Sequence, residues 1–109
     1  MVQKEGSIQE KTDGKRLTVI LRGEIDHHNA VRLRTSIDKL ISEKRPLTLV
    51  VDVEDIHFMD SSGLGLLMGR YKKMQELGGK MILQNPNTSV LKICQLAGLG
   101  RLIQIETKA

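Results

Sequence analysis

The sequence predicts an α/β domain with a mixed, mostly parallel β-sheet, an N-terminal hairpin and helices packed against the sheet. Short runs of β-branched and aliphatic residues alternate with longer segments in which apolar residues recur every three or four positions. An Asp-Gly turn signal also lies between the first two β-rich runs. Strands that alternate with helices favour parallel pairing with right-handed crossovers, whereas the hairpin adds one antiparallel pair.

The first half of the chain predicts two strands and a helix. The strands are expected at residues 6–9 and 17–22, on either side of a turn at residues 12–15. A polar loop at residues 23–29 follows, and Pro46 closes the region after the helix. The apolar positions that predict this helix are Ala30, Leu33, Ile37, Leu40 and Ile41.

The second half of the chain predicts alternating strands and helices. Residues 47–53 are apolar on both faces at several positions, which is typical of a covered central strand. A loop at residues 54–60 leads to a helix over residues 62–77, which Gly78-Gly79 ends. The remaining elements are a strand at 80–84, a helix that Asn87 or Thr88 caps and that runs to about Ala97, and a strand at 102–105. We expect residues 1–109 to form one domain.

The composition argues against several classes of function. Aromatic residues make up only 2% of the chain, and the net charge of +4 comes from basic residues scattered among acids. Direct binding of nucleic acid is therefore not expected, because it favours clustered cations and aromatic stacking platforms. Cys94 is the only cysteine, so an internal disulfide is excluded, and its apolar neighbours predict a small buried side chain.

The sequence also lacks the marks of a secreted or membrane protein. Its first five residues are polar without an apolar segment after them, and no apolar run approaches the ~18 residues of a membrane helix. We therefore expect a cytoplasmic protein without a membrane segment.

The segment from Phe58 to Leu67, FMDSSGLGLL, is the most informative part of the chain. It places two hydroxyls at a strand-to-helix corner, where Ser61 could cap the helix, although Ser62 or Asp60 could cap it instead. Hydrolysis is less favoured, because a G-x-S-x-G elbow would need glycine where Met59 stands. The remaining interpretation is a serine that accepts phosphate from a separate kinase, since the chain has no phosphate-binding loop of its own.

The helix after the serines has two distinct faces on a helical wheel. Leu64, Leu67, Tyr71 and Met74 are expected to face the core, with Leu66 toward the outer side. The outer face then contains Gly65, Gly69, Lys72, Lys73 and Glu76. Its two glycines predict a smooth surface that packs closely either within the domain or against a partner.

The serine segment and two further stretches carry a family resemblance. Residues 52–71, DVEDIHFMDSSGLGLLMGRY, resemble the signature of STAS-domain anti-sigma factor antagonists. Residues 23–28 resemble an earlier loop of that family, and residues 97–99 resemble the end of its last helix. The similarity runs from about residue 17 to residue 105 and implies a STAS-like fold.

The resemblance implies a partner switch. The unphosphorylated protein would bind an anti-sigma factor, which is also a serine kinase that supplies ATP and Mg²⁺, and would thereby release a sigma factor. Phosphorylation of Ser61 would end that binding, and a PP2C-type phosphatase would restore the serine. The chain itself would be a non-enzyme without a cofactor, monomeric when free. The implied partner surface consists of Asp26, His27, His28, Asp60, Ser61, Ser62, Gly63, Gly65 and Leu66.

Several alternatives remain open. Asp26 or Asn29 could cap the first helix, and for Asp26 this role is as plausible as a partner contact. His27 and His28 are too close in sequence for an ordinary helical metal pair, which favours a surface loop and no metal site. The chain could also be a STAS module of a stress-signalling scaffold, or a nucleotide-binding regulatory domain.

Overall fold

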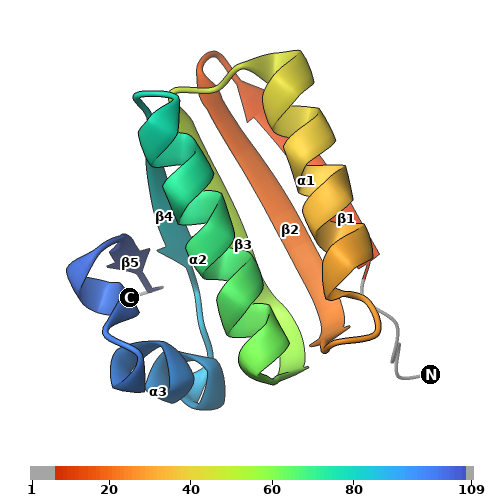
Figure 1. Ribbon diagram of the computed structural model, residues 1–109, viewed down its shortest axis with the longest axis vertical. Helices are drawn as coiled ribbons and strands as arrows, with labels where there is room; N and C mark the ends of the chain where they lie inside the picture. Colours follow the sequence, from red (N-terminus) through yellow and green to blue (C-terminus); the bar gives the residue numbers. More distant parts are fainter. Residues whose placement is uncertain (1–6, 108–109) are drawn as a thin grey trace.

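Figure 1 shows the computed structural model, which describes residues 7–107 as one five-stranded sheet with helices against it. The strand order is β1-β2-β3-β4-β5; β1 and β2 are antiparallel and the other neighbours are parallel. The predicted mixed α/β architecture is therefore confirmed. The elements are β1 (Ser7–Asp13), β2 (Arg16–Ile25), α1 (Ala30–Lys44), β3 (Thr48–Met59), α2 (Ser61–Glu76), β4 (Lys80–Gln84), α3 (Thr88–Leu96), the 3-10 helix η1 (Leu99–Arg101) and β5 (Gln104–Glu106).

The N-terminal hairpin is present, but its turn is tighter than the sequence indicated. Asp13 pairs with Arg16, so the loop is only Gly14-Lys15, and Thr12 belongs to the strand. Gly14 has a φ of +60°, a left-handed conformation that glycine adopts without steric cost. Gly6, the first residue of the expected strand, lies outside the described residues.

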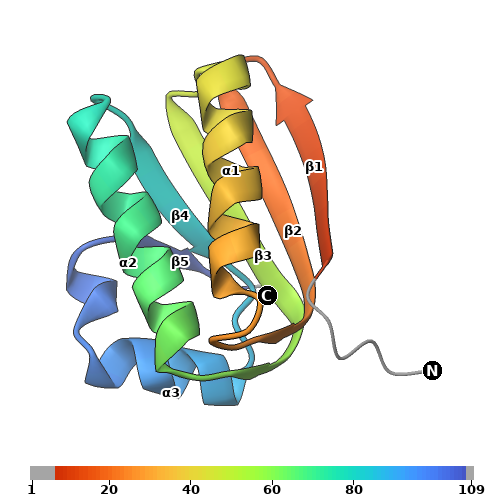
Figure 2. The same ribbon diagram turned by 45° about the vertical axis from the view of Figure 1, so that its right-hand side comes forward.

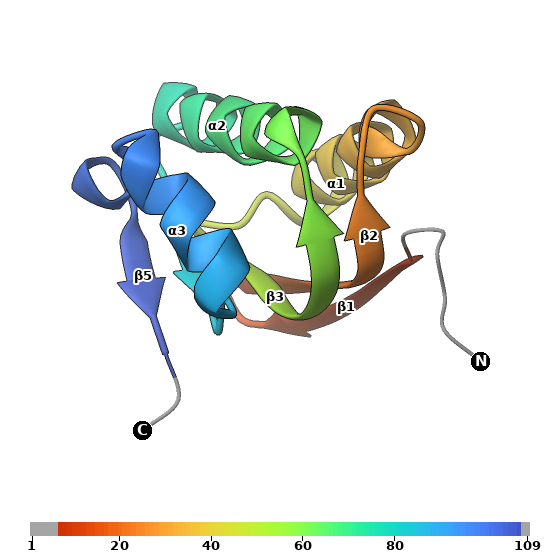
Figure 3. The same ribbon diagram turned by 90° about the horizontal axis from the view of Figure 1, so that it is seen from below.

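Helices α1 and α2 lie side by side on one face of the sheet, as Figures 2 and 3 show. In the part of the chain that the structure describes, no helix covers the opposite face (Figure 3). Burial alternates along β2, which is the pattern of a strand with one face against a core. The most completely buried core side chains of the sheet and α1 include Leu17, Val19, Leu21, Leu33, Ile37, Leu49, Val51 and Val53.

Strands β2 and β3 are both longer than expected. Strand β2 continues past Arg22 to Ile25, and β3 continues through the expected loop to Met59. Two register shifts, between Ile20 and Arg22 and between Gly23 and Glu24, accompany this extension. Such bulges break the two-residue alternation of a strand, so the sequence of this stretch resembles a loop. As a result, the two strands end together, with Ile25 opposite Met59.

Helix α2 is rotated relative to the expected wheel. Leu66, which was placed toward the outer side, is only 4% exposed, and Arg70 is only 7% exposed. Leu64 and Tyr71 are partly buried at the margin of the core. In this orientation Arg70 faces α1, and its Nη1 donates a hydrogen bond to Oδ1 of Asp38. This pairing allows a charged residue to occupy a core-facing position that hydrophobicity alone would not assign to it.

Among the described residues, none of the helices combines the length and the apolar character required to cross a bilayer.

Candidate partner-binding surface around Ser61

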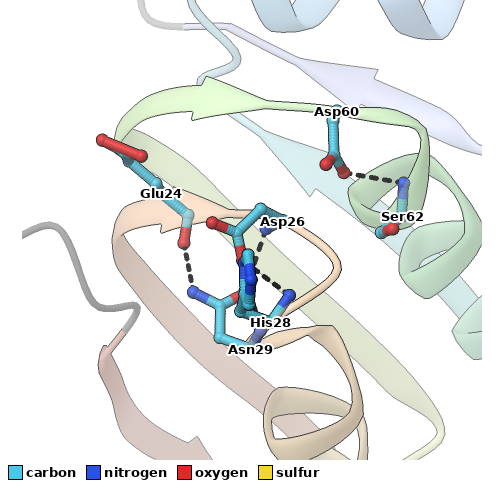
Figure 4. A network of polar contacts seen from close by, with 6 residues as sticks. All are labelled: Glu24, Asp26, His28, Asn29, Asp60 and Ser62. Atoms are coloured by element: carbon cyan, nitrogen blue, oxygen red, sulfur yellow. Dashed lines mark hydrogen bonds and ion pairs between the residues drawn. The ribbon is translucent and has the colours of Figure 1, made fainter.

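The serine corner, residues 60–63, joins the end of β3 to the start of α2. Asp60 has extended backbone, and its Oδ1 accepts a hydrogen bond of 2.8 Å from the N–H of Ser62 (Figure 4). Its carbonyl oxygen also accepts from the N–H groups of Gly63 and Leu64. Asp60 is therefore the cap among the three candidates. The cap does not use the hydroxyl of Ser61. Ser61 is the first residue of the helix, and it is exposed.

Gly63 allows the helix to begin directly against the sheet. A Cβ at this position would collide with Cγ of Met59, and would also lie 2.8 Å from Met59 Sδ and 3.1 Å from Ile25 Cγ2. These contacts come from the last residues of β2 and β3, so a larger side chain would push the helix away from both strands. Gly63 is buried, and its contribution to the corner is to fix where Ser61 stands.

The Asp26 loop, residues 26–29, connects β2 to α1 through a reciprocal hydrogen-bond network (Figure 4). Asp26 Oδ1 accepts from the N–H groups of His28 (2.9 Å) and Asn29 (3.2 Å). Asn29 Oδ1 accepts from the N–H of Asp26 (3.1 Å), and its Nδ2 donates to the carbonyl oxygen of Glu24 (2.7 Å). Asn29 stands at the N-cap position without a side-chain cap bond. Asp26 therefore orders the turn that leads into α1.

The Asp26 loop and the serine corner lie side by side. The N–H of Asp60 donates to the carbonyl oxygen of Ile25 (3.2 Å), which links the two loops through their backbones. His27 and His28 are exposed, and their ring centroids are 3.9 Å apart. Across residues 7–107, no group of three or more His, Cys, Asp or Glu residues is arranged to hold a metal ion. The implied partner residues thus converge on one end of the molecule.

A shallow depression of about 160 Å³ extends this surface between α1 and α2. It is lined by Ala30, Val31 and Arg34 from α1, and by Ser62, Gly65 and Leu66 from α2. Because Leu66 is otherwise buried, it contributes to the lining of the depression and little to the exposed surface. On the α1 side, the sequence signal is that Val31 is an aliphatic residue outside the apolar stripe of its helix; the structure shows it exposed beside α2.

The outer glycines of α2 have no packing role within the described chain. A Cβ at Gly65 or Gly69 would meet nothing within 4 Å. Close packing inside the domain, which was one of the two explanations for these glycines, is therefore wrong. The open space leaves a flat helix surface beside Ser61.

Known proteins are similar to this chain in sequence and in fold. The STAS domain family model matches residues 7–109. An anti-sigma F factor antagonist of Lysinibacillus sphaericus is 39% identical over 87 residues, which span 78% of this chain and 74% of that protein.

Two solved structures show the same fold. The anti-sigma factor antagonist SpoIIAA in its unphosphorylated form matches with a TM-score of 0.78 and 33% identity, over 91% of this chain and 87% of that one. The phosphorylated form of the Bacillus cell fate determinant SpoIIAA matches with a TM-score of 0.73 and 32% identity, over 91% of this chain and 90% of that one. The chain therefore belongs to the STAS domain family, among the anti-sigma factor antagonists.

Proposed function

We propose that this chain binds an anti-sigma factor in its unphosphorylated form and so releases a sigma factor, and that phosphorylation of Ser61 ends the binding. The observation that carries this proposal is the exposed Ser61 on the first turn of α2, beside a cap that Asp60 provides. The names of the relatives support the antagonist role. The chain then acts as a binding partner and a substrate, in the cytoplasm where sigma factors work.

The partner supplies the phosphorylation chemistry in this proposal. The anti-sigma factor is a serine kinase that brings ATP and Mg²⁺, and a PP2C-type phosphatase removes the phosphate. The chain contributes a defined position for the acceptor hydroxyl, since the corner is held by the Asp60 cap and by the close contact at Gly63. It binds its partner as a monomer through the residues around Ser61, including Asp26, His27 and His28.

The switch acts on the interface and leaves the fold intact. Phosphoserine adds about −1.5 to −2 charges at pH 7. A helix N-terminus favours such an anion by roughly 0.3–2 kcal/mol, so the domain tolerates it. At the interface the phosphate must lose water close to Asp26 and Asp60, and a penalty of about 3–4 kcal/mol weakens binding several-hundred-fold. The phosphorylated form of SpoIIAA has a fold similar to that of this chain, which supports the proposal that phosphate leaves the fold intact.

The acceptor is tested by incubating the chain with an anti-sigma kinase and Mg-ATP, followed by peptide mass spectrometry. We expect one phosphate, located on Ser61. The variant Ser61→Ala should take up no phosphate, whereas the matched variant Ser62→Ala should take up one, because Ser62 contributes its backbone N–H to the cap and not its hydroxyl. Phosphate located only on Ser62 would overturn the assignment.

Binding is tested by titration of the same kinase with three forms of the chain. The unmodified chain and Ser61→Ala should bind alike, and the phosphorylated chain should bind on the order of several-hundred-fold more weakly. Asp26→Asn separates the two roles of that residue: lost affinity with unchanged stability indicates a partner contact, and lost stability with unchanged affinity indicates only the loop. Equal binding of the phosphorylated and unmodified chains would contradict the proposal.

A further inference from the structure

A second surface feature lies at the opposite end of α1 and α2 from Ser61. It is a groove of about 460 Å³ between the end of α1, the start of β3 and the end of α2. We call it the basic groove. Its apolar lining comes from Ile41, Pro46, Leu47 and Leu77, and its charged lining from Arg45 and Lys73. Leu47 and Leu77 are 57% and 59% exposed, although both are large aliphatic side chains.

The charged side chains that line the basic groove have one sign, although Glu76 is exposed beside Leu77. Both charged residues that line it are cations. Lys15 and Lys80 lie next to it in the backbone, since the N–H of Leu47 donates to the Lys15 carbonyl (2.8 Å) and the N–H of Lys80 donates to the Leu47 carbonyl (2.9 Å). The acid nearest in sequence to Arg45, Glu43, lines a different depression between α1 and β1. The lining of the groove therefore combines apolar contact area with two cationic side chains.

The backbone of Arg45 is a second, independent observation. Arg45 is the C-cap of α1 with a φ of 47° and a ψ of 56°, which is left-handed. Glycine is the usual residue at a left-handed helix end, because a Cβ is disfavoured there. Arginine at this position places a long cationic side chain on the groove at the expense of local backbone preference.

We propose that the basic groove docks an acidic, amphipathic segment of a partner protein. Aliphatic side chains of that segment pack on Leu47 and Leu77, and its carboxylates pair with Arg45 and Lys73. The two exposed leucines favour a protein segment, because a small ligand within the groove would leave much of their surface in water. Charge complementarity then selects an acidic segment.

This docking is independent of the serine corner. From Ser61 to Leu77 the chain advances about 24 Å along α2, at 1.5 Å per residue. The two surfaces lie at opposite ends of the helix pair (Figure 1). A partner at the basic groove can therefore remain bound when Ser61 changes its state, and a third protein can be held beside the kinase.

The test uses a short fluorescein-labelled peptide of leucines and glutamates at helical spacing, with a matched peptide that carries lysine in place of glutamate. Fluorescence anisotropy should show saturable binding of the acidic peptide only. Lys73→Glu and Leu77→Ser should each weaken this binding about tenfold. The matched controls are Lys72→Glu, an exposed neighbouring lysine outside the groove, and Leu96→Ser, an exposed leucine on α3; both should keep the affinity within about twofold.

Four results would overturn the proposal. They are the absence of saturable binding, equal binding of the lysine peptide, equal losses for Lys72→Glu and Lys73→Glu, and a dimer in sedimentation that Leu77→Ser abolishes, which would make a second copy the occupant. Ser61→Asp should leave peptide binding unchanged, and a loss there would contradict the independence of the two surfaces. Because the assay contains no kinase, its outcome is separate from that of the phosphorylation test.

Discussion

Two glycines of the serine segment, Gly63 and Gly65, lie two positions apart and have different physical roles. Gly63 is buried at the point where α2 meets the ends of β2 and β3, and a side chain there has no space. Gly65 faces open space beside the shallow depression of the partner surface. The sequence motif contains both glycines, but only the three-dimensional structure distinguishes the one that shapes the corner from the one that keeps the surface flat.

Substitution by alanine should separate these roles. Gly63→Ala should lower the free energy of unfolding by about 1–3 kcal/mol, because its Cβ would collide with Met59. Gly65→Ala should raise it by up to about 1 kcal/mol, because alanine favours the helix and meets no neighbour. Urea denaturation monitored by circular dichroism measures both. Equal effects of the two substitutions would contradict the contact at Gly63.

Cys94 is buried in the core, as the sequence predicts, and burial raises the pKa of its thiol. A thiol that stays protonated in the folded state binds more protons there than in the unfolded state once the pH exceeds its ordinary pKa, about 8.5. Stability from this group is therefore fully present below that pH and is lost as the pH rises toward the folded pKa.

The Cys94 prediction is a decrease in stability on the alkaline side of about pH 8.5. Urea denaturation across that range should show a steeper decline for the unmodified chain than for Cys94→Ala, which has no thiol to ionise. The alanine variant should also be less stable at pH 7, because it leaves a small cavity. Parallel declines of the two proteins would show that the thiol does not contribute.

Helices α1 and α2 are joined by an ion pair in addition to aliphatic contacts. Arg70 of α2 is buried and pairs with Asp38 of α1, whose side chain is partly exposed. Arg70 Nε is buried without a hydrogen-bond partner among the described residues, so this guanidinium depends on Asp38 for its compensation. Removal of Asp38 should therefore destabilise the domain more than replacement of Arg70 by an uncharged side chain.

Asp38→Ala should cost about 1–3 kcal/mol of stability, because it leaves the Arg70 charge buried and unpaired; the partial exposure of Asp38 keeps the cost below that of a fully buried pair. Arg70→Met should cost less, because methionine fills the space without a charge and Asp38 can be solvated. The double variant should therefore recover stability relative to Asp38→Ala alone. Thermal and urea unfolding of all three variants measure this, and an additive double variant would contradict the coupling.

The elements show what periodicity can and cannot predict. Strands, helices and their order follow from apolar spacing, and Asp60, Ser61 and Asp26 follow from the motif. The extension of β3 through Glu54–Met59 was missed because bulges disturb its alternation. The orientation of α2 was missed because Arg70 enters the core through a partner 32 positions away in sequence. Val31 and Arg34 join the partner surface only because α1 packs beside α2, and the sequence alone does not show this packing.

The molecule as a whole places its proposed surfaces at the two ends of one layer of helices, α1 and α2. Both α1 and α2 pack on the same core, so their N-terminal ends present the region around Ser61 and their C-terminal ends present the basic groove. Aliphatic burial holds this layer, and each fully buried side chain contributes about 1.5–3 kcal/mol. A charge added at one exposed end of this layer leaves these aliphatic side chains buried.

Ser61→Asp should therefore leave the fold nearly unchanged while it weakens kinase binding. We expect its free energy of unfolding to differ from the unmodified chain by less than about 1 kcal/mol, because attraction to the N-terminus of α2 opposes repulsion from Asp26 and Asp60. Amide chemical shifts should change around the serine corner and the Asp26 loop, and not at the basic groove. Ser61→Lys is the matched control, and its free energy of unfolding should also stay within about 1 kcal/mol of the unmodified chain, because repulsion from the N-terminus of α2 opposes attraction to Asp26 and Asp60. Widespread shift changes in Ser61→Asp, reaching β4 and the end of α2, would show that the switch acts by rearranging the domain.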